Sequence, residues 1–537
     1  MNLHELNNVN NYIEVPALDY VPDPRGFGSF IYDFMVQHKD KIAQVDAKTG
    51  KTETYGELLH RCVRTSVYLR KIGVKSGDFI SVCTYNHLNT CVPSIAGFFI
   101  NAIMSAVDPI LSLEDTTHLL NQTKPKVIFT TLESVETIEA ASKRIGIVPK
   151  IVVFGNTDDH VNFIDIITRC YEVEETEFYP TAVSNLEEVG IVFFSSGTTG
   201  SSKAIVHNHY SLICQTWNNA NSGFNFDLTF GLHSPYWTVY ISVLGTSIVT
   251  GTARLVLPKF DRNNPWEPFQ RKPNYVILNV FQTVTLCEVP KPEDIDVSVV
   301  KDVIITGGII SSEQLKKFQS IFYASETYIL YGQTEVFGYM LHFSPKDYTM
   351  QKAKPTSAGR GLPGISYKIV DLESEATLGP NEKGELRVKT KYAMVGYKGI
   401  DSSNAWDENG WLKTGDVAYY DEDRCLYVVE RIKEMFKFQG WHVTPFTIEK
   451  VLLQHPAVAS AVVLGVAHAY DGHRPMGIVV LKPDCAEVTA EQIRKFVDVQ
   501  VEDRLRLRGG LKIVDGMPMT ASGKINRWKL KTNLGLS

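Results

Sequence analysis

Six short apolar runs alternate with segments of helical length between residues 126 and 307. Continuous apolar runs of strand length indicate strands that are buried on both faces, and their alternation with helices favours parallel, doubly wound sheets. We therefore predict an α/β fold whose large N-terminal domain contains doubly wound sheets. The runs are KVIFT (126–130), KIVVFG (150–155), GIVFF (190–194), ARLVLP (253–258), YVILNV (275–280) and DVIITG (302–307).

The pattern of the chain changes twice after these runs. From about residue 340, glycine and proline cluster in AGRGLPG (358–364), and the short runs YKIVD and GELRVK follow, which predicts a β-rich, more antiparallel subdomain at about 340–430. Near residues 428–440 a charged stretch precedes a helical pattern, TIEKVLLQH, and an apolar strand, SAVVLGV. We predict a large domain over residues 1–432 and a small, mobile α+β domain over 433–537, with a hinge near Lys433.

Composition and charge exclude several classes of protein. The 54 basic and 60 acidic residues give a net charge of −6, which offers no general attraction for nucleic acid or for an anionic membrane. Eight scattered cysteines form no CxxC pair, so we expect reduced thiols. The longest apolar run, 91–107, is too short to span a membrane and predicts a buried helix. With no signal-peptide pattern, we expect a cytoplasmic monomer or weak oligomer without a transmembrane segment.

A polar loop directly after the run at 190–194 is the strongest local signal for binding. Its glycines allow positive φ angles and close approach of backbone N–H groups to an anion, its hydroxyls are donors, and its lysine adds positive charge. We predict a phosphate-binding loop, although the Walker A spacing is absent. The alternative, a flexible Ser/Gly linker, fits poorly directly after a buried strand. The loop residues are Ser195, Ser196, Gly197, Thr198, Thr199, Gly200, Ser201, Ser202 and Lys203.

This loop resembles that of the adenylate-forming enzymes, which include acyl-CoA synthetases, coumarate-CoA ligases, insect luciferases and nonribosomal peptide adenylation domains. Further segments resemble the motifs of the same family in the family's order: YGQTE (331–335), GWLKTGD (410–416), ERIKEMFKFQGWHV (430–443) and PMTASGKINR (518–527). The resemblance covers nearly the whole chain. It implies an enzyme that uses ATP and Mg²⁺ to activate a carboxylic acid as acyl-AMP and then transfers the acyl group to coenzyme A.

The resemblance assigns roles to the YGQTE residues. Tyr331 supplies an aromatic face for adenine beside Gly332, Thr334 a hydroxyl for the α-phosphate, and Glu335 an oxygen ligand for Mg²⁺. Without the other motifs, such residues at a strand end are as often structural.

Two further residues are expected at the nucleotide. Asp416 offers two acceptor oxygens to a ribose diol, and Arg431 pairs with the ribose and the phosphate. The alternatives are a turn or helix-cap aspartate and an ordinary surface salt bridge.

The resemblance implies that the catalytic lysine is Lys524, which spacing alone places on the surface. In the family this lysine enters the cleft and bridges the carboxylate and the α-phosphate. For the second half-reaction the resemblance implies rotation about Lys433, which brings the segment from Lys437 to Trp441 over the adenylate, where Gly440 lets the pantetheine arm pass. A charged interdomain linker is the alternative interpretation of this segment.

The predicted acyl pocket departs from the family pattern. Tyr236 and Trp237 stand where many relatives have Phe-His, and Gly307 and Gly308 are followed by Ile309 and Ile310 instead of small residues. With Gln333, these residues predict a pocket for an apolar acid, either fatty or aromatic.

We therefore predict an AMP-forming acyl-CoA synthetase whose small-molecule partners are a carboxylic acid, ATP and coenzyme A. Two alternatives stay open at this point. One is luciferase-like oxidation of the adenylate, which Trp237 in place of the usual histidine disfavours. The other is a catalytically silent relative that binds nucleotide or acyl ligand. Firefly-type relatives end in Ser-Lys-Leu, a peroxisomal signal, whereas this sequence ends in Gly-Leu-Ser, which supports the expectation of a cytoplasmic protein.

Overall fold

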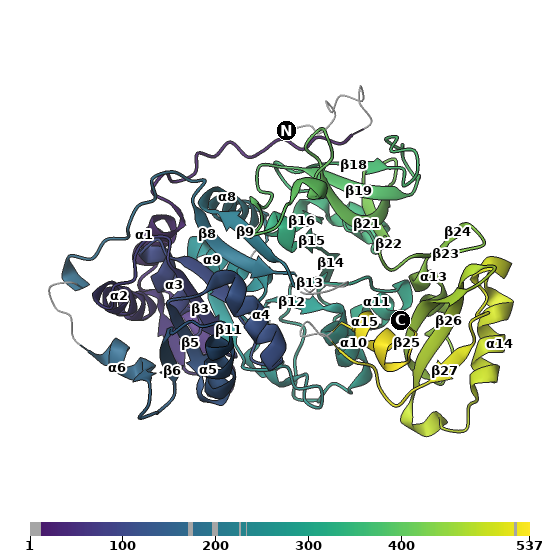
Figure 1. Cartoon of the computed structure of the whole chain (residues 1–537), viewed down its shortest axis with the longest axis horizontal. Helices are drawn as coiled ribbons and strands as arrows, with labels where there is room; N and C mark the ends of the chain where they lie inside the picture. Colours follow the sequence, from purple (N-terminus) through teal and green to yellow (C-terminus); the bar gives the residue numbers. More distant parts are fainter. Residues whose placement is uncertain are drawn as a thin grey trace.

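The computed structural model describes residues 12–169, 175–195, 202–224, 227–231, 233–519 and 524–536. These residues form two large, mostly parallel sheets, several smaller sheets and surrounding helices, with the C-terminal sheet at one end of the molecule (Figure 1). The predicted α/β class, with a large N-terminal part and a small C-terminal part, is confirmed.

One large sheet has the strand order β20-β9-β8-β4-β3-β5-β6-β7. Neighbouring strands from β8 to β7 are parallel, whereas β9 is antiparallel to β8 and β20. In β5, Val127 and Phe129 face one apolar core and Ile128 faces another, which explains the continuous apolar run. The strands are β3 (Phe79–Cys83), β4 (Ile103–Ala106), β5 (Val127–Thr131), β6 (Lys150–Phe154), β7 (Val161–Asn162), β8 (Val189–Phe194), β9 (Ala204–Asn208) and β20 (Gly396–Tyr397).

The other large sheet has the order β14-β13-β12-β10-β11-β1-β2 and is parallel except for the edge strand β2. Ile304 of β13 faces one core while Val303 and Ile305 face another. All six apolar runs are therefore strands, as predicted. The strands here are β1 (Ile42–Asp46), β2 (Thr52–Thr54), β10 (Leu228–Gly231), β11 (Ala253–Val256), β12 (Tyr275–Asn279), β13 (Asp302–Thr306) and β14 (Glu326–Ile329).

Helices cover the faces of these sheets. Helices α1, α2, α3, α8 and α9 contribute to one shared core, α4 and α5 pack on the opposite face of the eight-stranded sheet, and α10 and α11 pack on the seven-stranded sheet. Helix α3 is buried along its whole length, which confirms the predicted buried helix for the first half of the run 91–107, whereas residues 103–106 of that run form strand β4. The helices are α1 (Phe27–Gln37), α2 (Tyr55–Lys71), α3 (Val92–Phe99), α4 (Leu113–Thr123), α5 (Val135–Arg144), α6 (Phe163–Thr168), α8 (His209–Ala220), α9 (Thr238–Thr250), α10 (Val280–Glu288), α11 (Ser312–Ile321), α12 (Tyr348–Ala353), α13 (Pro445–Leu452), α14 (Ala490–Gln500) and α15 (Arg527–Asn533).

Three smaller sheets follow along the chain, and most of their pairings are antiparallel. They lead from the edge of the large sheets to the C-terminal unit (Figure 1). The antiparallel strands expected after residue 340 are present, while the domain limits 1–432, about 340–430 and 433–537 stay predictions. The strands are β15 (Tyr331–Gln333), β16 (Gly338–His342), β17 (Arg360–Gly361), β18 (Ser366–Val370), β19 (Gly384–Lys389), β21 (Leu412–Tyr420), β22 (Leu426–Arg431), β23 (Phe436–Phe438), β24 (Trp441–Val443), β25 (Val458–His468), β26 (Gly472–Leu481) and β27 (Leu511–Ile513).

Two further sequence expectations concern thiols and membranes. The seven cysteines in the described part of the chain are free thiols, in agreement with the predicted reduced state. No helix in the described ranges has the length and apolar character needed to cross a membrane.

A pH-dependent effect on stability is expected at Asp302 in β13, which pairs in register with Glu326 of β14. Burial, and then the charge of Glu326, raise the pKa of Asp302 from 3.8 to about 6. The folded protein therefore holds this proton to higher pH than the unfolded chain, so this contribution to stability is lost as pH rises from 3.8 through about 6. Asp302→Asn should stabilise the fold by about 1–2 kcal/mol at neutral pH and hardly at all near pH 4.

Thermal and urea unfolding at both pH values measure this difference. Glu326→Gln serves as the matched control and should give a smaller gain, because the charge of Glu326 is the lesser of the two causes. An equal gain from Asp302→Asn at both pH values would contradict the assigned origin of the shift.

Candidate active site

One large cavity, of about 1070 Å³, receives side chains from the N-terminal sheets and from the C-terminal end of the chain. It opens beyond the carboxyl ends of parallel strands, where ligands bind in open α/β sheets: Ser195 follows β8, Asn279 ends β12 and Thr306 ends β13. The predicted site residues that line it are Ser195, Lys203, Trp237, Gly307, Gly332, Gln333, Thr334, Glu335, Arg431, Lys433 and Lys524. Sequence motifs separated by more than 300 residues therefore meet at one cavity.

A buried carboxylate, Asp416 of β21, organises one wall of this cavity. The Tyr331 hydroxyl donates to Asp416 Oδ2 over 2.6 Å, and the Gln333 amide donates to the same oxygen over 2.7 Å. Arg431 Nε lies 3.3 Å from Asp416 Oδ1. Asp416 is thus held by three donors, and the guanidinium of Arg431 supplies the counter-charge that a buried carboxylate requires.

The side chains of Tyr331 and Gln333 both contact Asp416, whereas we predicted contacts with adenine and with the acyl group. The hydroxyl of Tyr331 is used by Asp416, and Tyr331 is absent from the described lining of the cavity. Gln333, predicted for the acyl pocket, donates to Asp416 and to the carbonyl of Thr414, so its amide is committed to the Asp416 wall. The roles of both residues toward a ligand stay predictions.

A second polar group forms around Glu335, just beyond β15. The Tyr397 hydroxyl donates to Glu335 Oε1 over 3.3 Å, and the Lys203 ammonium lies 4.6 Å from the centre of the Tyr397 ring. Burial raises the pKa of Glu335, because few charges compensate this carboxylate. A divalent cation at its free oxygen would reverse that shift, so the donor set fits a Mg²⁺ ligand.

A buried histidine holds the backbone between the Asp416 group and the Glu335 group. His207 Nε2 donates to the carbonyl of Thr334 over 2.7 Å, and burial lowers the pKa of His207 to about 4, so the ring is neutral at pH 7. This bond orients the start of the turn that carries Thr334 and Glu335.

Lys524 reaches the cavity from the C-terminal part of the chain. Its pKa is lowered from 10.5 to about 8, first by the loss of hydration in the cleft and then by the positive charge of Arg431, while Asp416 and Glu434 act in the opposite direction. A lysine in such a position still carries a proton at pH 7 and faces the same space as Lys203 and Arg431.

The predicted acyl-pocket residues divide into two groups. Trp237 and Gly307 line the cavity, as does Gln333, whereas Tyr236, Gly308 and Ile309 are absent from its described lining. Tyr236 is buried and stacks on Phe194, and the neighbouring Ile310 packs in the core of the seven-stranded sheet. The assignment of Tyr236, Gly308 and Ile309 to the pocket stays a prediction.

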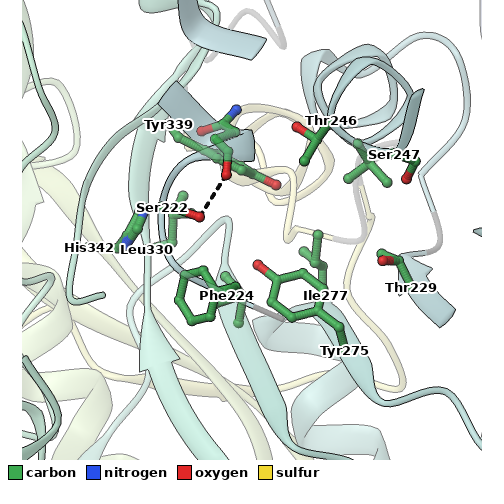
Figure 2. Close-up of a pocket in the computed structure, with 13 residues that line it drawn as sticks. Ser222, Phe224, Thr229, Thr246, Ser247, Tyr275, Ile277, Leu330, Tyr339 and His342 are labelled. Atoms are coloured by element: carbon green, nitrogen blue, oxygen red, sulfur yellow. Dashed lines mark hydrogen bonds between the residues drawn. The ribbon is translucent and has the colours of Figure 1, made fainter. Parts of the chain in front are cut away.

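A small chamber adjoins the cavity behind Tyr339 and Leu330, which line both spaces. Figure 2 shows the rings of Phe224 and Tyr275 and the side chain of Ile277 around this chamber. Most of its lining is apolar, but the hydroxyl of Tyr339 is buried there without a hydrogen-bond partner. We call this space the apolar chamber.

The remaining predicted residues lie elsewhere. Ser196, Gly197, Thr198, Thr199 and Gly200 fall outside the described residues, so their predicted contacts with phosphate are not addressed. Lys437 pairs with Glu373 over 3.2 Å, and neither Lys437 nor Gly440 is part of the described lining of the cavity.

Known proteins place the chain in a family. The AMP-binding enzyme family matches residues 32–398, and the AMP-binding enzyme C-terminal domain matches residues 447–524. The chain belongs to the AMP-binding, adenylate-forming enzymes. This confirms the resemblance stated from the motifs, and enzymes of this family act with ATP and usually with Mg²⁺.

Relatives of this adenylate-forming enzyme span nearly its whole length. A luciferin 4-monooxygenase of Nipponoluciola cruciata is 26% identical over 98% of this chain and 97% of its own. A 4-coumarate-CoA ligase of Petroselinum crispum is 28% identical over 96% of this chain and 95% of its own. The solved structure of the luciferase-like enzyme from the nonluminescent mealworm Zophobas morio is 32% identical, with a TM-score of 0.75 over 79% of this chain and all of that one.

Motif reasoning missed several residues of the cavity. Tyr397 lines the cavity and contacts Glu335, and His207, which is outside the described lining, contacts the carbonyl of Thr334. Tyr397 lies in β20, which joins the eight-stranded sheet by pairing with β9. No spacing in the sequence signals that pairing, so only the tertiary structure reveals the contact.

The titration of Lys524 is testable without any assumption about activity. Acetylation with acetic anhydride over a range of pH, followed by peptide mass spectrometry, should give an apparent pKa of about 8 for Lys524. Arg431→Gln should raise this value, because the nearby positive charge is removed. Exposed Lys391 serves as the internal reference in the same digest. An apparent pKa near 10.5 for Lys524 would contradict the influence of the cleft and of Arg431 on its ammonium.

Proposed function

We propose that this adenylate-forming enzyme is an AMP-forming acid:CoA ligase that activates an apolar carboxylic acid with ATP and Mg²⁺ and transfers the acyl group to coenzyme A. The observation that carries the proposal is the convergence of Lys524, Lys203 and Arg431 on one cavity. Bringing a carboxylate against a triphosphate is the main electrostatic difficulty of adenylation, and preorganised cations in a partly desolvated cleft reduce it.

In this proposal each cation of the cavity binds a different part of the substrates. Lys203 holds the outer phosphates beside the Ser195 loop, and Arg431 with Asp416 holds the ribose. Lys524 lies between the carboxylate and the α-phosphate and neutralises charge as the oxygen of the acid attacks phosphorus and pyrophosphate leaves. Thr334 donates a hydrogen bond to the α-phosphate. Glu335 would hold Mg²⁺, which, when bound, screens the phosphate charges.

The nature of the acid is inferred from the walls of the cavity. Trp237 and Gly307 line the cavity, and Leu330 and Tyr339 line both the cavity and the apolar chamber. That chamber, lined by Phe224, Tyr275 and Ile277, supports an acid with an aliphatic or aromatic body.

Coenzyme A as the acceptor is supported by the 4-coumarate-CoA ligase of Petroselinum crispum, which is similar along nearly all of this chain. We propose that the unit from Lys433 onward turns about this hinge after adenylation. Lys524 would then leave the cleft, and Lys437 and Gly440, now on the exterior, would cover the adenylate and admit the thiol.

The first test of the proposal is pyrophosphate release from ATP and Mg²⁺ with a panel of fatty and aromatic acids. Lys524→Ala should lower the rate of adenylation by about two to four orders of magnitude, because it removes the cation that faces the reacting oxygens. Thioester formation from supplied acyl-AMP and coenzyme A should fall much less. Equal loss in both assays would contradict the role of Lys524, and light emission in a parallel detector would favour the luciferase-like alternative.

The second test uses a variant that should slow thioester formation and leave adenylation unchanged. Lys437→Ala removes a charge that lies outside the adenylation cleft, so pyrophosphate release should stay within about twofold of the wild type while the thioester step slows by about tenfold or more. Glu373→Ala, which breaks the same surface ion pair, is the control and should leave both steps unchanged. A loss of adenylation in Lys437→Ala would contradict the proposed rotation.

A further inference from the structure

A buried arginine without a carboxylate partner lines a small chamber beside the large cavity. Arg254 of β11 pairs in register with Gln44 of β1 and is 7% exposed. Its Nη2 donates to Gln44 Oε1 over 2.8 Å and lies 3.3 Å from Cys91 Sγ. Within the described ranges, no carboxylate forms an ion pair with Arg254. Burying a cation is costly, and the hydrogen bonds of Arg254 to Gln44, Cys91 and Tyr240 supply no anion to balance its charge.

Arg254 lines a small chamber of its own, which we call the basic chamber. The chamber holds about 30 Å³, room for about two water-sized groups or one carboxylate. His87 and His233 also line it, and burial lowers the pKa of each to about 4, so both rings are neutral at pH 7. Among the described lining residues, Arg254 is therefore the one charged group.

The basic chamber shares a wall with the large cavity. Asn86, His233 and Val239 line both spaces. Two polar atoms at this wall, Asn86 Oδ1 and His233 Nδ1, are buried without a hydrogen-bond partner, and Asn86 is 7% exposed. Buried polar atoms are nearly always paired in native proteins, so the unpaired His233 Nδ1 between the large cavity and a charged chamber points to a missing ligand group. Asn86 Oδ1 is an acceptor and would pair only with a donor.

We propose that the acid activated by this enzyme carries a second carboxylate at its far end, and that Arg254 binds this group in the basic chamber. The inference rests on the proposed function and specifies its substrate as a dicarboxylic acid with an apolar middle. The reacting carboxylate lies near Lys524, the chain passes Val239, and the distal carboxylate enters beside the ring of His233, whose carbonyl accepts from Asn86 Nδ2 over 3.1 Å. His233 Nδ1, when protonated as the donor tautomer, and Arg254 then both donate to it.

An anion fits this chamber better than a hydroxyl group. A distal hydroxyl would satisfy Asn86 Oδ1, but it would leave the guanidinium uncompensated. The nearest acidic group in the hydrogen-bond network is Glu53, which accepts from Gln44 over 2.8 Å and is already paired with Arg61. The charge of Arg254 is therefore available to a ligand.

The experiment compares acids with the same carbon skeleton in the pyrophosphate-release assay. Hexanedioic, octanedioic and decanedioic acids are each measured beside their monomethyl esters, the plain monocarboxylic acids and the ω-hydroxy acids. The wild type should use the best diacid at least about tenfold more efficiently in kcat/KM than its ester, because the ester leaves Arg254 unpaired. Equal use of diacid and ester, or a preference for the ω-hydroxy acid, would overturn the proposal.

Variants test whether Arg254 is responsible. Arg254→Gln should lower kcat/KM for the diacid by about tenfold or more while changing that for the ester by less than about threefold, and Arg254→Lys should retain part of the preference. Arg61→Gln is the matched control, because it disturbs the Gln44–Glu53 network from its other end and leaves the chamber charge in place. If Arg254→Gln lowers the efficiency for diacid and ester equally, Arg254 is structural and the proposal fails.

A binding measurement separates this inference from the proposed function. Without ATP, octanedioic acid should stabilise the wild-type protein against heat and should not stabilise Arg254→Gln, whatever the catalytic outcome. If sodium formate or chloride gives the same Arg254-dependent stabilisation and the diacid gives no more, the chamber holds a free anion and the proposal is overturned. If every acid fails to release pyrophosphate but diacid binding persists, the proposed function fails and the distal site stands.

Discussion

The position of Lys524 depends on the ion pairs of Arg527. Its guanidinium contacts Glu449 of α13 at 2.7 and 2.9 Å and Glu434 of the hinge segment at 3.0 Å, and it donates to the carbonyl of Val463. Arg527 Nη2 contacts both carboxylate oxygens of Glu449, and hydrogen bonds between ionised groups are among the strongest in proteins. Because Arg527 lies three residues beyond Lys524, these contacts hold this part of the chain beside Glu434 and α13, and Lys524 lines the cavity.

The electrostatics of the cleft follow from that attachment. Lys524 adds to the positive charge of Arg431 and Lys203, and loss of hydration in the cleft and the charge of Arg431 lower the pKa of Lys524. Opposite them stand the buried carboxylates Asp416 and Glu335. The site is thus a set of fixed charges in a partly desolvated cavity, which suits the stabilisation of a transition state between two anions. In our proposal, the buried charge of Arg254 plays the corresponding part at the remote end of the acid.

The two large sheets explain why such a site can exist in this fold. The carboxyl ends of parallel strands from both sheets meet at one cavity: β8 comes from the eight-stranded sheet, and β12 and β13 from the seven-stranded sheet. Tyr397 reaches this cavity through the pairing of β20 with β9, which brings its ring over Lys203 and its hydroxyl to Glu335. The smaller sheets then bring Asp416 and Arg431 to the opposite wall.

The sequence by itself determined the α/β class, the six buried strands and the family, because apolar runs and motif spacing are local properties of the chain. It also indicated that Lys203, Glu335 and Lys524 belong to one site, through the order of the motifs. Only the tertiary structure decided that Gln333 serves Asp416, that His207 and Tyr397 support the Glu335 turn, and that Arg254 faces a chamber beside the cavity. These contacts join residues that are far apart in the chain. Because such contacts produce no regular spacing of residues, the sequence pattern could not predict them.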